Sequence, residues 1–366
     1  METPVSRLLR SFTSALFVTP LAIALALPPL PAQATTAAAV PASATTSSPS
    51  KAAAGWLASQ LKNGNHLQSC FGGSCFPDYG LTADAVIGMA STHSAGNAIG
   101  RATSWLAAHA TDYIGATDGT GPYPGSYAKL ALVAEVSGRR PAAFGGVDLL
   151  ARLRALQCPH PGCTAGQRGE FRNRLPDGGF SNVITQSLAI VALSRSGRAA
   201  DRVAVPAAAA FLKRQQCASG GFPTVFPAGG TCTAEVDATA FAVQALLSAH
   251  SPTSGAVRWL VGQQQHNGGF VGSGTVNANS TGLANEALAA AGRPTAAARR
   301  YLLTLQLRCH TAPANRGAIK YNGTAGFKVA TALRATPQGI LGLTQVPLAK
   351  VSAAGAAPGA LRLACG

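Results

Sequence analysis

Residues 259–288 read WLVGQQQHNGGFVGSGTVNANSTGLANEAL, and this stretch contains the unit from which most of the chain is built. It opens on a large apolar pair, Trp259-Leu260, passes through a glycine loop, Gly268-Gly269-Phe270, and ends in the Ala/Leu-rich segment Thr281–Leu288. Paired glycines permit the positive φ angles of a tight turn, and the phenylalanine anchors that turn in the core. The stretch therefore predicts two helices joined by a glycine loop, the second helix being buried on most sides.

This unit recurs along the chain. Copies of the buried segment begin at residues 82, 127, 186, 239, 281 and 326, each preceded by a second helical stretch that carries more of the Arg and Gln. One helix pair buries little apolar surface, so the pairs must stack. Six pairs related by equal rotations predict a closed all-α (α/α)6 toroid, with an inner barrel of six helices and a half-exposed outer layer of six. An open solenoid is the alternative.

The composition restricts the class of protein. The chain has 366 residues, of which 47% are hydrophobic and only 11% charged, so it is too apolar to be disordered throughout. No run of 18 apolar residues lies beyond the N-terminus, which excludes a polytopic membrane protein. The net charge of +16 favours an anionic cell-envelope surface as a partner. Aromatic residues are only 6% and the arginines are scattered, so we expect no nucleic-acid partner.

The N-terminus has the features of an export signal. Arg7 and Arg10 precede the apolar run Ala15–Leu27, and Ala32-Gln33-Ala34 supplies small residues for cleavage. We therefore expect a signal peptide over 1–34, a flexible leader over 35–52, the toroid of six repeats over 53–345 and a latching tail over 346–366. The protein is predicted to be secreted or to reside in the extracellular cell envelope. An uncleaved anchor is the alternative for residues 1–34.

Export favours disulfides for the eight cysteines, since an even number of cysteines is typical of disulfide-bonded exported chains. Eight cysteines allow 105 pairings, and proximity in the sequence selects four. The C-x4-C spacing and the scattered histidines fit zinc poorly, so we expect no metal. The predicted bonds are Cys70–Cys75, Cys158–Cys163, Cys217–Cys232 and Cys309–Cys365.

The glycine loops resemble the QW motif of the terpenoid cyclase and protein prenyltransferase superfamily, which runs aromatic, aliphatic, three residues, Gln, a short gap and Gly-x-aromatic. Two units match and a third begins the motif and then departs; Phe ends the motif where the family often has Trp. The resemblance covers about residues 53–345 and implies the same toroid, in a degenerate secreted member. The residues concerned are Phe211-Leu212, Gln216 and Gly220-Gly221-Phe222, then Trp259-Leu260, Gln264 and Gly268-Gly269-Phe270, and finally Tyr301-Leu302 and Gln306.

The resemblance also implies chemistries. Protein prenyltransferases hold zinc with an Asp and a nearby Cys, whereas Asp237 is followed by Thr239, so a zinc prenyltransferase is disfavoured. In class II cyclases, intramolecular isomerases or lyases, the middle Asp of D-x-D-D-T-A protonates an alkene or epoxide. The run Glu235-Val236-Asp237-Ala238-Thr239-Ala240 is similar to that motif, with Asp237 as general acid and Glu235 tuning it. The content of three Trp, six Tyr and 13 Phe is low for a cavity that must hold carbocations.

Asp237 also has a structural interpretation. It stands just before the predicted inner helix, and its equivalent in the next unit is Asn279. Asp and Asn are preferred N-caps because they satisfy backbone amides that have no partner in the helix. We therefore weigh helix capping against acid catalysis at this residue.

Polar residues in the predicted inner layer are costly unless they find partners, so they either line a central cavity or pair with a neighbouring helix. The candidates for ligand binding are Asp84, Gln186, Gln244, Asn285 and Glu286. The favoured function is a cell-envelope protein that binds an apolar small molecule, isoprenoid or lipid, without a cofactor. The alternatives are the class II cyclase and a non-catalytic interaction scaffold.

Overall fold

We describe a computed structural model of the chain, which covers residues 44–115, 121–172, 181–226 and 231–365. The predicted signal peptide 1–34 lies outside the described residues, as does the leader up to residue 43. Part of the predicted leader forms regular secondary structure. The short strand β1 (Thr45–Thr46) and helix α1 (Pro49–Gln60) fall within the stretch taken as leader. Pro49 occupies the first turn of α1, where its fixed φ and missing N–H favour a helix start.

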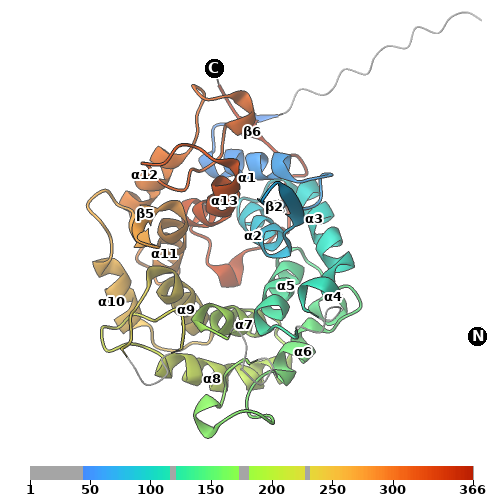
Figure 1. The fold of residues 1–366 in the computed structure, drawn as a ribbon, viewed down its shortest axis with the longest axis vertical. Coiled ribbons are helices and arrows are strands. Elements are labelled where there is room, and N and C mark those ends of the chain that lie inside the picture. The colour runs from blue at the N-terminus through green and yellow to red at the C-terminus, as the bar shows by residue number, and fades with distance from the viewer. Residues whose placement is uncertain (1–43, 116–120, 173–180, 227–230, 366) are drawn as a thin grey trace, which may run out of the picture. The chain divides into compact units, whose positions relative to one another are not determined.

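Six helices form the inner layer. Each packs against the next in sequence, and the last packs against the first, so the ring is closed (Figure 1). Most residues of these helices are buried, including small and apolar residues on several sides of each helix. The inner helices are α2 (Tyr79–Ala90), α5 (Pro124–Val136), α7 (Val183–Arg195), α9 (Val236–Ser248), α11 (Ala278–Ala290) and α13 (Val329–Thr344).

A second layer of helices surrounds the ring (Figure 1). Most of these helices bury one stripe: α12, for example, buries Ala298, Tyr301, Leu302 and Leu305 and exposes much of its remaining surface. Helix α1 differs, because its residues 52–57 are all buried. The predicted all-α (α/α)6 toroid is therefore confirmed. The outer helices are α1, α3 (Gly96–Ala108), α6 (Leu149–Ala155), α8 (Ala199–Arg214), α10 (Ser254–Gly262) and α12 (Ala296–Leu305), and the short α4 (Ala110–Tyr113) follows α3.

The connections between outer and inner helices contain more regular structure than the sequence indicates. Two are β-hairpins, β2 (Gln68–Phe71) with β3 (Ser74–Pro77) and β4 (Phe270–Gly272) with β5 (Thr275–Asn277). β1 pairs in parallel with β6 (Arg362–Leu363) in the tail. Single 3₁₀ turns complete the fold: η1 (Pro141–Ala143), η2 (Ala165–Gln167), η3 (Pro313–Asn315) and η4 (Leu348–Lys350).

One hydrogen bond recurs in five of the six units and ties each glycine loop to its inner helix. In the fourth unit the Thr239 hydroxyl accepts from Phe222 N at 2.8 Å. The same bond is made in three other units by the hydroxyls of Thr82, Thr281 and Thr336. In the third unit the side-chain amide oxygen of Gln186 accepts it from Phe171 N. This hydrogen bond also corrects the alignment of the sixth copy, which was predicted to begin at Gly326. The residue equivalent to Thr239 in that copy is Thr336. Helix α13 begins at Val329, about one turn further ahead of its anchoring threonine than the other inner helices do.

Glycine allows the tightest helix contact in the ring, between α11 and α13. A Cβ on Gly282 would lie 2.1 Å from the Gln338 carbonyl oxygen, and one on Gly342 would lie 2.6 Å from Gly282 Cα. Real Cβ atoms do not approach backbone so closely. Only glycine therefore permits this separation of the two helices.

All four predicted disulfides are found. Three lie in connections from outer to inner helices, and Cys309–Cys365 joins the tail to the connection that precedes α13. The ring is also closed between its two ends by Gln306 Nε2, which donates to the Pro49 carbonyl at 2.8 Å. The end of the chain thus holds the first and last units together.

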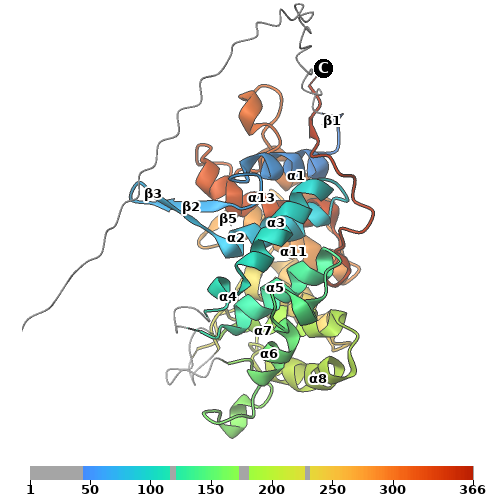
Figure 2. The same cartoon turned by 90° about the vertical axis from the view of Figure 1, so that its right-hand side faces the viewer.

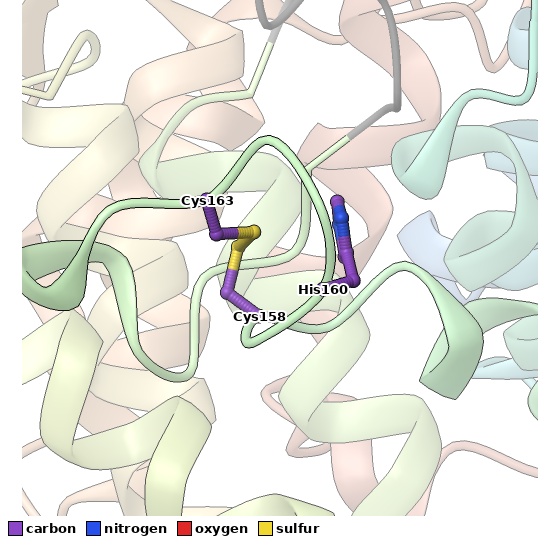
Figure 3. Close-up of side chains that lie close together, drawn as sticks. All are labelled: Cys158, His160 and Cys163. Carbon is purple, nitrogen blue, oxygen red and sulfur yellow. A yellow bond between two sulfur atoms is a disulfide. The ribbon is translucent and has the colours of Figure 1, made fainter.

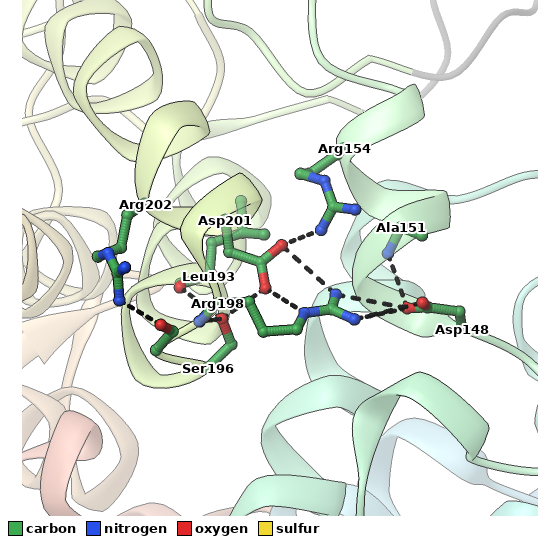
Figure 4. A network of polar contacts seen from close by, with 9 residues as sticks. Asp148, Ala151, Arg154, Leu193, Ser196, Arg198, Asp201 and Arg202 are labelled. Atoms are coloured by element: carbon green, nitrogen blue, oxygen red, sulfur yellow. Dashed lines mark hydrogen bonds and ion pairs between the residues drawn. The ribbon is translucent and has the colours of Figure 1, made fainter.

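Between the α6 and α8 units lies a network of ion pairs (Figure 4). The Asp201 carboxylate is fully buried and contacts Arg154, Arg198 and Ser196. Burial opposes its charge, but hydrogen bonds from Arg198 and Ser196 and the charge of Arg154 hold its pKa below the ordinary value. Arg198 continues to Asp148, the N-cap of α6. This network fixes the outer helices of the third and fourth units to one another.

Candidate functional site

A cavity of ≈ 180 Å³ lies inside the ring, and every inner helix contributes to its wall. One end is closed by the tail: the 3₁₀ turn η4, which lies inside the ring in Figure 1, contacts α7 and α9. The Arg195 guanidinium holds this turn by donating to the Leu348 and Val351 carbonyls. The lining residues are Asp84, Ile87, Lys129, Ile184, Leu188, Asp237, Phe241, Leu283, Glu286, Pro337, Gln338, Leu341 and Leu348.

The repeat explains which side chains reach the cavity. The residue two positions after Thr239 or its equivalent lines the wall in all six units. Lys129 belongs to this set, as one of the polar inner-layer residues expected to line a cavity or to pair with a neighbouring helix, although it was not selected for ligand binding. Gln338 was not predicted, and alignment of the copies on their loop hydrogen bond would have found it. The six residues are Asp84, Lys129, Leu188, Phe241, Leu283 and Gln338.

Two of the six are charged and pair with each other. Lys129 Nζ lies 2.8 Å from Asp84 Oδ1, and the two side chains are 20% and 31% exposed. Burial alone would lower the pKa of Lys129. The charge of the Asp84 carboxylate, with a smaller contribution from Tyr113, is stronger than this effect and raises the pKa of Lys129 above its ordinary value. The pair is therefore a stable dipole on the α2 and α5 side of the cavity.

Asp237 is not the N-cap of its helix. The N-cap of α9 is Glu235, and Asp237 lies in the first turn with its side chain at the cavity wall. In other units the caps are Asp78, Asn182 and Asn277, whose side chains accept the expected backbone amide. The capping interpretation of Asp237 is thus wrong, because the N-cap lies two residues before it. The helix begins at Val236, earlier than the segment starting at Thr239 from which the prediction was made.

The environment of Asp237 favours the protonated acid. Burial raises the pKa of this carboxyl; the nearby Ser280 hydroxyl lowers it, and the charge of Glu235 raises it again. Its Oδ1 atom is buried and has no hydrogen-bond partner among the described residues. Glu235 itself is exposed, and its carboxylate accepts from the Thr224 hydroxyl at 3.1 Å. Glu235 therefore acts on Asp237 through charge.

Glu286 is the second buried acid of the cavity. Its side chain is 2% exposed, and burial raises its pKa well above the ordinary value, although the nearby Gln244 amide lowers it. Its Oε1 atom also lacks a partner among the described residues. Gln244 reaches the closed end of the cavity, where its Oε1 accepts from Leu348 N at 3.3 Å. The structure thus brings Glu286 and Gln244 together.

Gln186 and Asn285 lie elsewhere. The Gln186 amide is completely buried and bonds backbone groups of Phe171, Gly169 and Ala208. The Asn285 amide donates to the Gly342 carbonyl, and its oxygen accepts from Thr295 N. Both side chains join helices or loops and neither is among the cavity-lining residues.

The cavity continues into a second pocket at the end opposite η4. This pocket of ≈ 330 Å³ shares Lys129, Ile184 and Leu188 with the cavity. Its other walls come from the first turns of α5 and α7, among them Tyr123 and Asn182, and from Tyr113. The two pockets therefore adjoin at these three side chains, and the second lies at the end where the inner helices begin.

Another cavity, of ≈ 460 Å³, lies where α5 and α7 end and is lined by Glu135, Arg195 and Arg198 among others. These charged groups already contact the protein. Arg195 Nε lies 3.3 Å from Glu135 Oε2, and Arg198 pairs with Asp148 and Asp201. Among the described residues, Glu135 has Arg195 as an ion-pair partner, although its carboxylate oxygens accept no hydrogen bond, whereas Asp237 and Glu286 have no cationic partner. The central cavity is therefore the better candidate site.

Metal ligation is a poor fit to the residues present. Cys158, His160 and Cys163 place possible ligand atoms close together, but the two sulfurs form a disulfide and are not thiolates (Figure 3). At the position of the prenyltransferase zinc, Asp237 would need a partner at residue 239. The Thr239 hydroxyl already accepts from Phe222 N and donates to the Glu235 carbonyl. The side chains here do not form a zinc site.

Comparisons with known proteins give the same architecture. No protein-family model matches the chain, and no curated protein matches it. Among solved structures, a protein from Actinoplanes matches with a TM-score of 0.57 and 16% identity, covering 81% of this chain and 98% of that one. The type II terpene cyclase MstE from Scytonema matches with a TM-score of 0.57 and 13% identity, covering 81% and 97%.

The protein geranylgeranyltransferase-I of Candida albicans, complexed with GGPP, matches with a TM-score of 0.51 and 12% identity, covering 75% of this chain and 89% of that one. At these identities the likeness concerns the fold. The chain shares the α/α toroid of the terpenoid cyclase and protein prenyltransferase superfamily, as the resemblance of its glycine loops predicts.

Proposed function

We propose that the protein binds one small amphipathic molecule, of isoprenoid or lipid character, in the central cavity. The observation that carries this proposal is the wall itself. Apolar side chains surround three buried polar atoms that have no partner among the described residues: Asp237 Oδ1, Glu286 Oε1 and Gln338 Oε1. An unpaired buried polar atom costs about 1–3 kcal/mol, so a ligand that supplies the missing partners is favoured.

The ligand must be short or must extend out of the ring. A cavity of ≈ 180 Å³ is smaller than the roughly 300–1,000 Å³ of most small-molecule sites. The adjoining pocket of ≈ 330 Å³ provides the remaining space. We therefore place one end of the molecule beside Leu283 and Phe241 in the cavity and its other end along Ile184 and Leu188.

The polar end of the ligand is proposed to be neutral. Burial raises the pKa of both acids and so favours their protonated forms, which can donate one hydrogen bond and accept others. A hydroxyl, carbonyl or ether oxygen satisfies such groups without burying a further charge. A bare hydrocarbon would leave all three atoms unpaired.

The isoprenoid class rests on the structural neighbours. MstE variants were solved in complex with geranylgeranyl dihydroxybenzoate, and the Candida transferase with GGPP. These names describe those proteins, and the likeness extends to this chain as a fold analogy. The analogy agrees with the apolar wall, on which isoleucine and leucine predominate.

A second candidate function, class II cyclisation, is favoured by Asp237. This residue combines burial, a raised pKa and an unpaired oxygen at the cavity wall, which are the properties of a general acid in a dry site. Against it, Phe241 is the one aromatic side chain on the described wall of the central cavity, and the Lys129 ammonium lies on the same wall. Aromatic faces stabilise carbocations and an ammonium opposes them, so binding is preferred.

Export is also proposed. Four disulfides persist in an oxidising compartment, which agrees with the signal-like residues 1–34. Among the described residues, no helix has the length and apolar character needed to cross a bilayer.

The test uses the exported protein, its N-terminus read by mass spectrometry. The protein is incubated with a total lipid extract, and retained and converted species are identified. Retention that persists in Asp237→Ala and falls about tenfold in Glu286→Leu supports binding. Conversion abolished by Asp237→Ala supports the cyclase. Gly100→Ala, in the exposed part of α3, is the control for folding and handling. If wild type neither retains nor converts any species, the scaffold interpretation replaces both.

A further inference from the structure

The hairpin formed by β2 and β3 projects from the end of the ring at which the inner helices begin (Figure 2). It carries two phenylalanines at the surface: Phe71 is 69% exposed and Phe76 is 58% exposed. The other large apolar side chains that are exposed in the described part of the chain are all valines. Two exposed aromatic rings on one small element are unusual for a free surface and indicate an interaction site.

The strand register puts both rings on the same face of the hairpin. Phe71 pairs with Ser74, and Ser69 pairs with Phe76. Side chains alternate along a strand, so these four residues share one face, and the two rings are diagonal neighbours about 7–8 Å apart at the backbone. The Cys70–Cys75 pair lies on the opposite face and joins the strands covalently.

The Cys70–Cys75 disulfide joins the two strands directly beside the turn. Gly72 and Gly73 form the turn with positive φ angles of 56° and 87°. A Cβ at either glycine would meet nothing within 4 Å, so no other described segment packs on the turn at these two positions. The hairpin therefore presents its aromatic face in a fixed shape, and binding through it does not require ordering a flexible loop.

One arginine lies at the foot of this face, and further cations lie in the connection that leads to α13. Arg334 Nη2 lies 3.0 Å from the Ser69 hydroxyl and 3.3 Å from Asp78 Oδ2. Lys328 is exposed just before α13, and Val329 beside it is 42% exposed. The whole connection from α12 to α13 contains no Asp or Glu. Its cations are Arg308, Arg316, Lys320 and Lys328.

We infer that this end of the toroid docks on an anionic lipid surface, with Phe71 and Phe76 inserted at the level of the headgroups. Aromatic side chains beside Lys and Arg are the combination that binds such an interface, since insertion and attraction to anionic headgroups add. A second copy of this chain would bring together two molecules of net charge +16, which opposes self-association. The pocket that adjoins the central cavity lies at the same end, but docking does not depend on the proposed ligand.

The test is cosedimentation of the exported protein with vesicles of phosphatidylglycerol and phosphatidylcholine. Wild type is expected to bind, and binding is expected to weaken at least about tenfold in Phe71→Ser/Phe76→Ser. Lys320→Gln/Lys328→Gln should weaken it severalfold and reduce its dependence on salt, since each cation near the surface attracts the anionic headgroups. Val203→Ser, at an 80% exposed position on the outer helix α8, is the matched control and should bind as wild type does.

Three results would overturn the inference. The first is wild-type protein that stays in solution with anionic vesicles. The second is equal binding by wild type and the double phenylalanine variant. Binding would then be due to features that both proteins have in common, such as their N-terminal residues or their net positive charge. The third is sedimentation equilibrium that shows a wild-type dimer lost in Phe71→Ser/Phe76→Ser, which would assign the aromatic face to a second copy.

Discussion

Lys129 Nζ lies 2.8 Å from Asp84 Oδ1, so an ion pair joins the first and second inner helices. At the equivalent position of the repeat, the other four inner helices have uncharged residues. Lys129→Met leaves the Asp84 carboxylate partly buried without its cation, and should lower the free energy of unfolding by about 1–3 kcal/mol. Asp84→Asn/Lys129→Met should recover part of that loss, because no charge remains unpaired. Urea unfolding measures both. Equal midpoints for the single and double variants would show that the pair does not couple.

Glu286 should make the protein less stable as the pH rises. Its folded pKa is raised well above the ordinary 4.5. Below pH 4.5 both states hold the proton and the group has no effect; above it the unfolded state ionises first and is favoured. Stability should fall by at most about 1.4 kcal/mol per pH unit until the folded pKa is reached. Glu286→Gln should flatten thermal midpoints measured from pH 5 to 9. An unchanged slope would assign the dependence to other groups.

Gly282→Ala should be strongly destabilising. The added methyl would meet the Gln338 carbonyl oxygen of α13 at 2.1 Å, so the two helices must separate and their contact is lost. We expect a loss of at least about 2 kcal/mol. Gly100→Ala, on α3 with nothing within 4 Å, should instead gain up to about 1 kcal/mol from helix propensity. Thermal unfolding of both variants checks the contrast, and two effects of the same sign would refute it.

Loss of Cys309–Cys365 should cost more than loss of Cys70–Cys75. The first bond closes 56 residues and the second only 5, so the first restricts the unfolded chain more. The chain-entropy relation gives about 4 kcal/mol for the first and about 2 for the second. The paired Cys→Ser variants, compared by guanidinium unfolding, test this order. A reversed order would mean that strain or residual structure in the unfolded state dominates.

Much of the fold could be predicted from the sequence because the inner helices repeat the same Ala/Leu-rich frame and glycine loops mark several of the turns between the two layers. The disulfides followed because each partner is a close neighbour in the chain, apart from Cys309 and Cys365, which remain as the last pair. The sixth register was missed because Gly326 begins a segment of similar composition, whereas the anchoring hydroxyl belongs to Thr336.

The site was harder to predict. Asp84 and Glu286 could be found as polar residues on buried helices, but the same reasoning selected Gln186 and Asn285, whose amides bond backbone groups. Sequence does not distinguish a buried amide that joins two helices from an acid that faces a cavity. The closure of the cavity by η4 depends on Arg195 and the Leu348 carbonyl. A carbonyl acceptor is present at every residue and leaves no signal in the sequence.

The closure of the ring between Gln306 and Pro49, 257 residues apart, has a consequence for how the protein is made. Helices α1 and α2 are the first helices to leave the ribosome, whereas α13, which packs against both of them, is synthesised almost last. Contacts between segments so far apart in the sequence form slowly, and a partly synthesised chain exposes apolar surface that is prone to aggregation. The ring can therefore close only when nearly the whole chain is available, so the arrival of α13 sets the moment of assembly.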